Sequence, residues 1–179
     1  LRKWLDEGRK PLPVSANISR YDLFRTDIIE VIGALTEQYQ IPTQLLRFEV
    51  TESAFAESTD RVIDVVERLR AGGFMVEIDD FGSGYSSLNT LKDVPADILK
   101  LDMRFLENGR NSARGGNILE SIVRMAKWLG MPVIAEGVET REQADYLKSI
   151  GCYYIQGYLY ARPMTAGEYE AFTKGFSKE

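Results

Sequence analysis

The sequence of 179 residues contains no histidine and only one cysteine, Cys152. Without histidine, Ser-His-Asp catalysis, histidine-ligated zinc and a histidine general base are excluded. A single cysteine excludes a disulfide framework within the chain and fits a reducing compartment. Any catalysis must therefore rely on carboxylates, amides and lysine.

Long apolar runs and an excess of positive charge are also missing. No apolar segment approaches the roughly 20 residues of a transmembrane helix, and no signal peptide is recognised. The net charge of −5 argues against passive binding to a DNA or RNA polymer or to an anionic membrane. We therefore expect a cytoplasmic location and no membrane contact by this segment. A phosphate-bearing ligand would need cations at its site.

What the sequence does contain is a regular alternation of short apolar segments and amphipathic segments. The predicted strands are 13–19, 45–50, 74–78, 98–101, 132–135 and 153–156. The predicted helices are 21–39, 59–69, 115–129, 140–150 and 165–176, with no more than a helical turn at 88–91. Alternating strands and helices predict a parallel sheet.

The fold class follows from the strand ends. Short apolar strands that each end in a polar residue are typical of a (β/α)8 TIM-like barrel, whose site lies at the carboxyl ends of the strands. An open doubly wound sheet is the alternative, but it normally has a glycine-rich nucleotide loop after its first strand, and none is present. A full barrel usually takes roughly 250 residues, and residues 1–8 have the pattern of a helix whose beginning is missing. We therefore predict an α/β barrel, here incomplete with about six βα units.

The segment DDFGSGYSS, residues 79–87, is the most unusual stretch of the sequence. Asp79 and Asp80 follow the predicted strand 74–78 and precede a loop rich in glycine and serine. Successive side chains of a strand point to opposite faces, so the two carboxylates converge only if the strand ends there. Such an end suits a hard cation, which prefers oxygen ligands. An acidic turn without a ligand is the alternative.

Carboxylates, amides and one lysine recur at the ends of the other predicted strands. This set comprises Asn17, Glu49, Glu52, Asp79, Asp80, Lys100, Asp102, Glu136, Glu139 and Gln156. In a parallel barrel these positions lie on one rim, where clustered like charges need compensation. Oxygen ligands without histidine or cysteine favour Mg²⁺ or Mn²⁺ over zinc. The number of carboxylates predicts two ions about 4 Å apart, the usual arrangement for in-line displacement at phosphorus.

Each of these positions also has a purely structural interpretation. Asn17 could cap the helix that follows it, and Glu49 could occupy an exposed edge. Lys100 could form a salt bridge with a neighbouring carboxylate. Glu136 could belong to a turn, and Gln156 could pair with the backbone. A shared site explains their recurrence at successive strand ends better than separate structural roles do.

The sequence resembles the EAL-domain family of bacterial cyclic di-GMP phosphodiesterases. The resemblance is carried by Asn17 in VSANIS, Glu49 in FEVTES, Asp79 and Asp80 in DDFGSGYSS, Lys100 in LKLD, Glu136 in AEGVET and Gln156 in IQGYLYARP. It covers essentially the whole chain, and the combination of DDFGSGYSS with AEGVET is highly specific. It implies a single EAL-like domain over residues 1–179, N-terminally truncated, that hydrolyses cyclic di-GMP to linear pGpG.

The resemblance implies a pair of metal sites. Asn17, Glu49 and Asp79 would hold one ion. Asp79, Asp80 and Glu136 would hold the second, with Asp79 bridging the two. The ions implied are Mg²⁺ or Mn²⁺, with Ca²⁺ inhibitory.

The resemblance also implies contacts with the reacting groups and the substrate. Lys100 would position the attacking water or hydroxide, and Gln156 would lie against that water or the phosphate. Gly157 would also contact the substrate, and Pro163 would line the guanine pocket.

A third implication concerns assembly. Glu52 would steady the loop formed by Phe81, Gly82, Ser83, Gly84, Tyr85, Ser86 and Ser87. This loop would link metal binding to the packing of a homodimer. Sensor or cyclase domains, often membrane-anchored, would precede this segment in the parent protein.

The sequence departs from the family in one respect. The Glu-Ala-Leu motif and the arginine that follows it are absent, and by resemblance they would lie before residue 1. The missing glutamate is a ligand of the first metal, so the parent protein is expected to be active and the 179-residue chain itself inactive. The main alternative is a degenerate receptor module that binds cyclic di-GMP without cutting it. An unrelated metal-dependent barrel with Lys100 as base, and a structural remnant, remain further alternatives.

Overall fold

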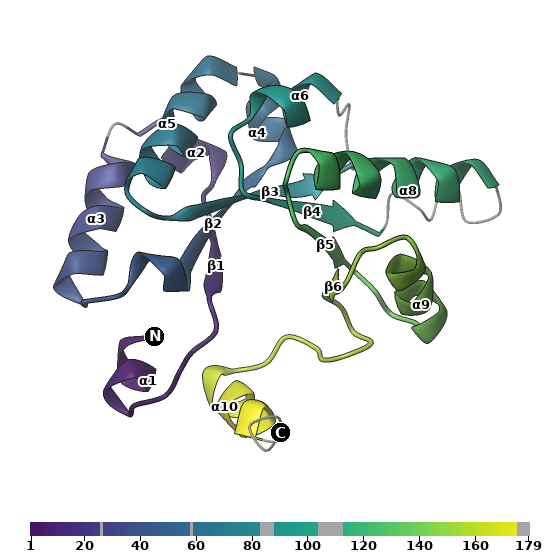
Figure 1. Ribbon diagram of the computed structural model, residues 1–179. Coiled ribbons are helices and arrows are strands. Elements are labelled where there is room, and N and C mark those ends of the chain that lie inside the picture. Colours follow the sequence, from purple (N-terminus) through teal and green to yellow (C-terminus); the bar gives the residue numbers. More distant parts are fainter. Residues whose placement is uncertain (26, 58, 83–87, 104–112, 175–179) are drawn as a thin grey trace.

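The computed structural model describes residues 1–25, 27–57, 59–82, 88–103 and 113–174. Its strands form one sheet in which neighbouring strands are parallel and follow one another in chain order (Figure 1). The strands are β1 (Val14–Asn17), β2 (Leu46–Thr51), β3 (Met75–Phe81), β4 (Ile98–Asp102), β5 (Val133–Glu136) and β6 (Tyr154–Ile155).

Helices cover the outer side of this curled sheet (Figure 1). The helices of the described ranges are α1 (Arg2–Asp6), α2 (Arg20–Leu23), α3 (Ile28–Gln38), the 3-10 helix η1 (Thr43–Leu45), α4 (Glu52–Glu57), α5 (Thr59–Ala71), α6 (Leu88–Asp93), α8 (Ala113–Trp128), α9 (Arg141–Ser149) and α10 (Ala166–Lys174). None of them is both long and apolar enough to span a bilayer. A doubly wound sheet would reverse its strand order at a switch point, and this sheet does not. The predicted incomplete (β/α)8-like barrel is therefore confirmed.

The hydrophobic core lies between the outer face of the sheet and the helices. Alternate residues of the central strands point outward and are fully or almost fully buried, namely Phe48, Val50, Val76, Ile78, Leu99 and Leu101. Buried residues of α5 and α8 pack in the same cluster, including Val62, Val66, Leu69, Leu119 and Ala126. The amphipathic helices thus bury their apolar stripes on one side of the sheet only.

The opposite, inner face of the sheet carries polar side chains. Because strand side chains alternate, the residues between the core positions point into the half-barrel. On β2 to β4 the inner positions include Glu49, Glu77, Asp79 and Lys100, of which the last three are buried. The lumen of this barrel is therefore charged, where the interior of a barrel is more often filled with branched apolar residues.

Strand β3 differs from its predicted course. It does not end at Ile78 but continues to Phe81, and its pairing with β4 shifts register between Ile78 and Phe81. Asp80 has a φ of +56°, in the left-handed region that few residues other than glycine adopt. This irregularity lets Asp79 remain on the inner face while the chain turns at Asp80. The predicted end of the strand at Ile78 was therefore wrong, whereas the expected departure from a regular strand at the two aspartates is present.

Several helices also differ from the sequence interpretation. The predicted helix 21–39 is divided into α2 and α3, and α2 has its own N-cap in Ser19, whose side chain accepts a hydrogen bond from Asp22 N. Helix α4 directly after β2 was not predicted. The N-cap at Thr140 is confirmed as a complete capping box with Gln143, which fixes the start of α9.

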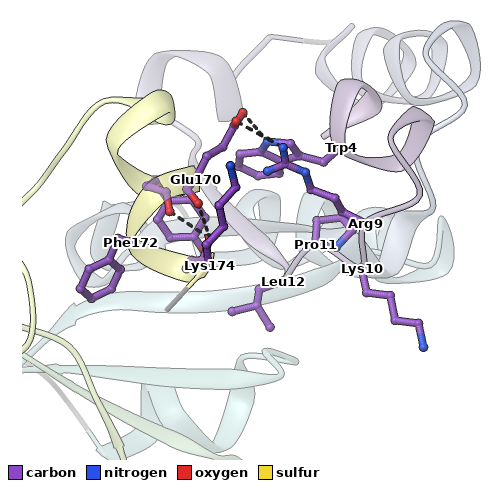
Figure 2. A pocket seen from close by; sticks show the side chains of 10 residues that line it. Trp4, Arg9, Lys10, Pro11, Leu12, Glu170, Phe172 and Lys174 are labelled. Carbon is purple, nitrogen blue, oxygen red and sulfur yellow. Dashed lines mark hydrogen bonds and ion pairs between the residues drawn. The ribbon is translucent and has the colours of Figure 1, made fainter. Parts of the chain in front are cut away.

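The first and last helices are joined at the open side of the half-barrel (Figure 1). In the close-up of Figure 2, Trp4 Nε1 donates a 2.8 Å hydrogen bond to Glu170 Oε1. Lys3 Nζ lies 3.1 Å from the same oxygen, and Arg9 Nη2 lies 3.4 Å from Glu170 Oε2. Hydrogen bonds from Trp4 and Lys3 lower the pKa of Glu170 to about 2. The rings of Trp4 and Tyr169 also pack, with centroids 5.7 Å apart. We call this contact the α1–α10 clasp.

Candidate active site

A lysine surrounded by three carboxylates forms the centre of the candidate site. Lys100 Nζ lies 2.6 Å from Glu49 Oε1, 2.7 Å from Glu136 Oε1 and 3.1 Å from Asp79 Oδ1. Lys100 is only 4% exposed, and the three carboxylates are largely buried. Three of the predicted metal ligands and the predicted catalytic lysine therefore lie together.

Strand pairing explains this convergence. Thr51 of β2 is the register partner of Asp79, so Glu49 lies one pleat below Asp79 on the inner face. Lys100 is the register partner of Ile134, and Glu136 lies one pleat above it on the same face. Each side chain belongs to a different strand of the sheet, and each strand is paired to its neighbour by a backbone ladder. The site is thus fixed by the sheet itself.

The cluster carries more negative than positive charge. Three carboxylates face one ammonium, so the fully ionised group has an excess of two negative charges. Burial raises the pKa of Glu136, and nearby Asp79 and Glu49 add to this effect, while Lys100 opposes it. Burial would lower the pKa of Lys100, but its interactions with Glu136 and Glu49 outweigh it and raise the pKa above the ordinary value. Lys100 is therefore a permanent cation at neutral pH.

Two buried oxygens of the cluster have Lys100 as their only counter-charge among the described residues. Asp79 Oδ1 and Glu136 Oε1 lie within ion-pair distance of Lys100 Nζ, yet neither accepts a hydrogen bond with acceptable geometry. A buried oxygen without a hydrogen bond, in a cluster with excess negative charge, suits a hard divalent ion. The residues present therefore fit Mg²⁺ or Mn²⁺ in their chemistry. Their carboxylates point at Lys100, however, and within the described ranges no three acidic, cysteine or histidine side chains are arranged around a common ion position.

A cavity of about 450 Å³ lies beside this cluster, at the carboxyl ends of β3 to β6. It is lined by Asp80, Asp102, Glu136, Gly137, Glu139, Gln156, Gly157 and Tyr158. Four of these residues are acidic, and Glu136 belongs to the cavity as well as to the cluster. The strand ends thus bring Asp80, Gln156 and Gly157 to one opening next to Glu136. A common rim for Asp80, Glu136 and Gln156 was predicted from the strand ends.

Comparison with known proteins identifies the fold family. The model of the EAL domain family matches residues 1–163. This chain belongs to the EAL domain family. It is 37% identical over 169 residues to the cyclic di-GMP phosphodiesterase NbdA of Pseudomonas aeruginosa, covering 94% of this chain and 22% of NbdA. The chain therefore spans less than a quarter of the length of that relative.

Solved structures resemble this chain over most of its length. The phosphodiesterase PaMucR, in complex with c-di-GMP, superposes with a TM-score of 0.86 at 34% identity, covering 94% of this chain and 68% of that one. BlrP1 of Klebsiella pneumoniae, in a manganese and cy-diGMP complex, has a TM-score of 0.78 at 32% identity, covering 84% of this chain and 39% of that one. The half-barrel of this EAL chain thus matches part of their structures.

The remaining predicted positions of this EAL domain are placed less uniformly. Asn17 ends β1 and is the register partner of Glu49, so it lies beside the cluster but is exposed. Pro163 is exposed and does not line the 450 Å³ cavity. At Gly157 an added Cβ would lie 2.1 Å from Val138 O, so glycine is required there by a close backbone contact. Its position at the cavity mouth follows from this packing.

Glu52 makes the contact that the sequence interpretation suggested. Its carboxylate is buried, and Glu52 Oε2 accepts a 2.9 Å hydrogen bond from Gly82 N, immediately after β3. Phe81 is buried at the end of β3. The rest of the predicted coupling loop lies outside the described residues, namely Ser83, Gly84, Tyr85, Ser86 and Ser87.

Sequence reasoning missed two charged residues of the lumen, Glu77 and its ion-pair partner Arg47. Glu77 is fully buried, between Val76 and Ile78 on β3, and it shares the inner face with Asp79. Its position two residues before Asp79 could have placed it on that face, because strand side chains repeat every second residue. A cation–π contact was also missed. The guanidinium carbon of Arg162 lies 4.5 Å from the centroid of the Tyr158 ring.

Proposed function

We propose that this EAL domain contributes a cyclic di-GMP phosphodiesterase site that cuts one phosphodiester bond by in-line attack of water and gives linear pGpG. The observation that carries the proposal is the buried cluster of Glu49, Asp79, Lys100 and Glu136, in a family whose similar members include NbdA, named as a cyclic di-GMP phosphodiesterase. The PaMucR structure in complex with c-di-GMP supports this substrate class.

The proposed cofactor is a pair of Mg²⁺ or Mn²⁺ ions. Asn17, Glu49 and Asp79 would hold one ion, and Asp79, Asp80 and Glu136 the other. When bound, such ions lower the pKa of a coordinated water and neutralise phosphate charge. The oxygen-only donor chemistry of the cluster, its excess of negative charge and the manganese complex of BlrP1 support this proposal. Ca²⁺ would inhibit, since its longer bonds and looser geometry misplace the reacting groups.

Lys100 is proposed to act as a fixed positive charge. Its pKa is raised, so at neutral pH it has no free lone pair with which to remove a proton. It can donate a hydrogen bond to the attacking water or hydroxide and stabilise the charge of the phosphoryl transition state. This assignment disfavours the alternative of an unrelated metal-dependent barrel enzyme, because that enzyme would need Lys100 as a general base.

The substrate is proposed to occupy the 450 Å³ cavity next to the cluster. This volume falls in the range of about 300–1,000 Å³ that is usual for small-molecule sites. Gln156 and Gly157 line it, and Pro163 would contact the guanine from the following segment. The four acidic residues of the lining would repel a phosphate unless metal ions neutralise them, which ties substrate binding to metal binding.

We also infer a homodimer coupled to the site through the segment that starts at Phe81. The hydrogen bond between Glu52 and Gly82 supports this coupling, since it fixes the chain directly after Asp79 and Asp80. Cytoplasmic location and sensor or cyclase domains in the parent protein are part of the same proposal. The small share of NbdA that this chain covers is compatible with further domains.

The test is cyclic di-GMP hydrolysis in Mg²⁺ or Mn²⁺, comparing the 179-residue chain with a version extended at its N-terminus to roughly 250 residues, the usual length of a barrel. Hydrolysis to pGpG by the longer version only would support both the enzyme and the role of a missing glutamate. Binding without turnover in both versions would favour the receptor alternative. Hydrolysis by the short chain would show that no ligand is missing from it.

A further inference from the structure

A second polar layer lies directly beneath the candidate site on the inner face of the sheet. It consists of Ser15 of β1, Arg47 of β2 and Glu77 of β3, each two residues before a predicted metal ligand of the same strand. Arg47 Nη1 donates a 3.2 Å hydrogen bond to Glu77 Oε1, and Ser15 Oγ donates a 3.0 Å hydrogen bond to Glu77 Oε2. Each carboxylate oxygen of Glu77 thus accepts one hydrogen bond, and the residue is fully buried.

Arg47 is incompletely paired in this layer. Its side chain is 26% exposed, and its Nε is buried without a hydrogen-bond partner. Among the described residues, Glu77 is the only carboxylate within ion-pair distance of its guanidinium. Glu77 therefore supplies the negative charge that balances Arg47 in this layer. Without Glu77, the largely buried guanidinium would have no compensating carboxylate.

A carboxylate that could replace Glu77 lies two residues after Arg47 on the same strand and belongs to the candidate site. Glu49 follows Arg47 by two residues on β2, so the two side chains point the same way and start about 6.6 Å apart. An arginine side chain spans that distance and pairs with a carboxylate in two-pronged geometry. Glu49 already accepts a 2.6 Å hydrogen bond from Lys100. A second cation on Glu49 would neutralise it and compete with any metal ion.

We propose that Glu77 is a positioning residue that holds Arg47 away from Glu49, so that the Glu49 carboxylate stays available to a metal ion. This inference rests on the proposed function, because it assumes that the cluster binds a divalent ion. It goes further in giving a role to a residue that touches neither metal nor substrate. The purely structural alternative is that the Arg47–Glu77 pair only joins β2 to β3.

The two interpretations predict different effects of single substitutions on the affinity for Mn²⁺. If Glu77 restrains Arg47, Glu77→Gln should weaken Mn²⁺ binding about tenfold, the lower end of the usual effect of altering a partner outside the ligands. Arg47→Met should not weaken it, because the competing cation is gone. The double variant Arg47→Met/Glu77→Gln should return to within about twofold of wild type, in line with the loss of the competitor.

The experiment is a Mn²⁺ titration by electron paramagnetic resonance of the version extended at its N-terminus to roughly 250 residues, which includes the expected glutamate ligand. Circular dichroism verifies that each variant is folded. Ser15→Ala is the matched control: it removes the other contact of Glu77 but leaves Arg47 paired, and should bind Mn²⁺ like wild type. If Glu77→Gln does not fold, Glu77→Asp shortens the same carboxylate, and its binding should also be weaker than wild type.

Three results would overturn the inference while leaving the metal site intact. They are wild-type affinity in Glu77→Gln, equally weak binding in Arg47→Met and Glu77→Gln, or a double variant as weak as Glu77→Gln. A wild-type extended version that binds no Mn²⁺ would overturn the proposed metal site, and this inference with it. Failure of the inference alone is thus distinguishable from failure of the proposed function.

Discussion

The two faces of the sheet are built by the same strands but have opposite character. On β4, Leu99 points into the core between sheet and helices, whereas its neighbour Lys100 points into the half-barrel among three carboxylates. On β3, Ile78 likewise points into the core and Asp79 points into the half-barrel. Adjacent residues thus serve the hydrophobic core and the candidate site. We expect changes on the outer face to reduce stability, and changes on the inner face to reduce binding and turnover.

The largest effect is expected from replacing the central cation of the inner face. Lys100→Met should lower kcat about 10²–10³-fold, the usual cost of removing one group that stabilises transition-state charge. It also leaves three buried carboxylates without their ammonium, so Mn²⁺ should raise the melting temperature of the variant more than that of wild type. Steady-state kinetics of the version extended at its N-terminus measure the loss of turnover, and thermal unfolding measures the effect of Mn²⁺ on stability. Turnover within tenfold of wild type would contradict the assignment.

The neighbouring position tests the outer face. Leu99 is fully buried, so Leu99→Ala should lower the free energy of unfolding by about 2–5 kcal/mol through lost contacts and a cavity. Under conditions where the variant is still folded, its Mn²⁺ affinity should equal that of wild type. Urea unfolding and metal titration measure the two properties. A loss of affinity with little loss of stability would show that the two faces are not independent.

A smaller effect is expected from an ionisable group on the apolar side of the sheet. Burial raises the pKa of the Cys152 thiol to about 11. Because the folded-state pKa lies above the ordinary value of 9.0, the stability from the neutral thiol is complete below pH 9 and is lost as pH rises through about 11. The expected loss is up to about 2 kcal/mol.

The measurement is urea unfolding between pH 8 and 11, with Cys152→Ala as the control for the other groups that titrate there. The variant should show a shallower decline than wild type. The thiol should also react slowly with a disulfide reagent at pH 8, since little thiolate is present. Identical pH dependence in both proteins would contradict burial of the neutral thiol.

Much of the difference between the two faces could be predicted from the sequence, because it depends on the alternation of strand side chains between them. Apolar residues around Glu49 and Lys100 indicated buried strands, and polar residues at successive strand ends indicated a common rim. The structure confirms that Glu49, Asp79, Lys100 and Glu136 lie together. Local patterns contain this information because a parallel sheet aligns the ends of its strands.

Other features depend on backbone geometry or on neighbours from distant strands. The left-handed conformation of Asp80 and the register shift beside it follow from how β3 meets β4, which no local pattern encodes. Glu77 looked like an ordinary strand residue, because its partners Arg47 and Ser15 lie on other strands. The ion-pair distances around Lys100 likewise arise only when three other strands are in place.

The α1–α10 clasp joins segments that are 166 positions apart in the chain, as the Trp4–Glu170 hydrogen bond shows. Its other contacts, from Lys3 and Arg9 to Glu170, span similar separations. Contacts between segments so distant in sequence require the closure of a long loop, whose entropy cost precedes any gain from the contact. We therefore expect the clasp to form only after the sheet between the two helices is in place, and to report on complete folding of the half-barrel.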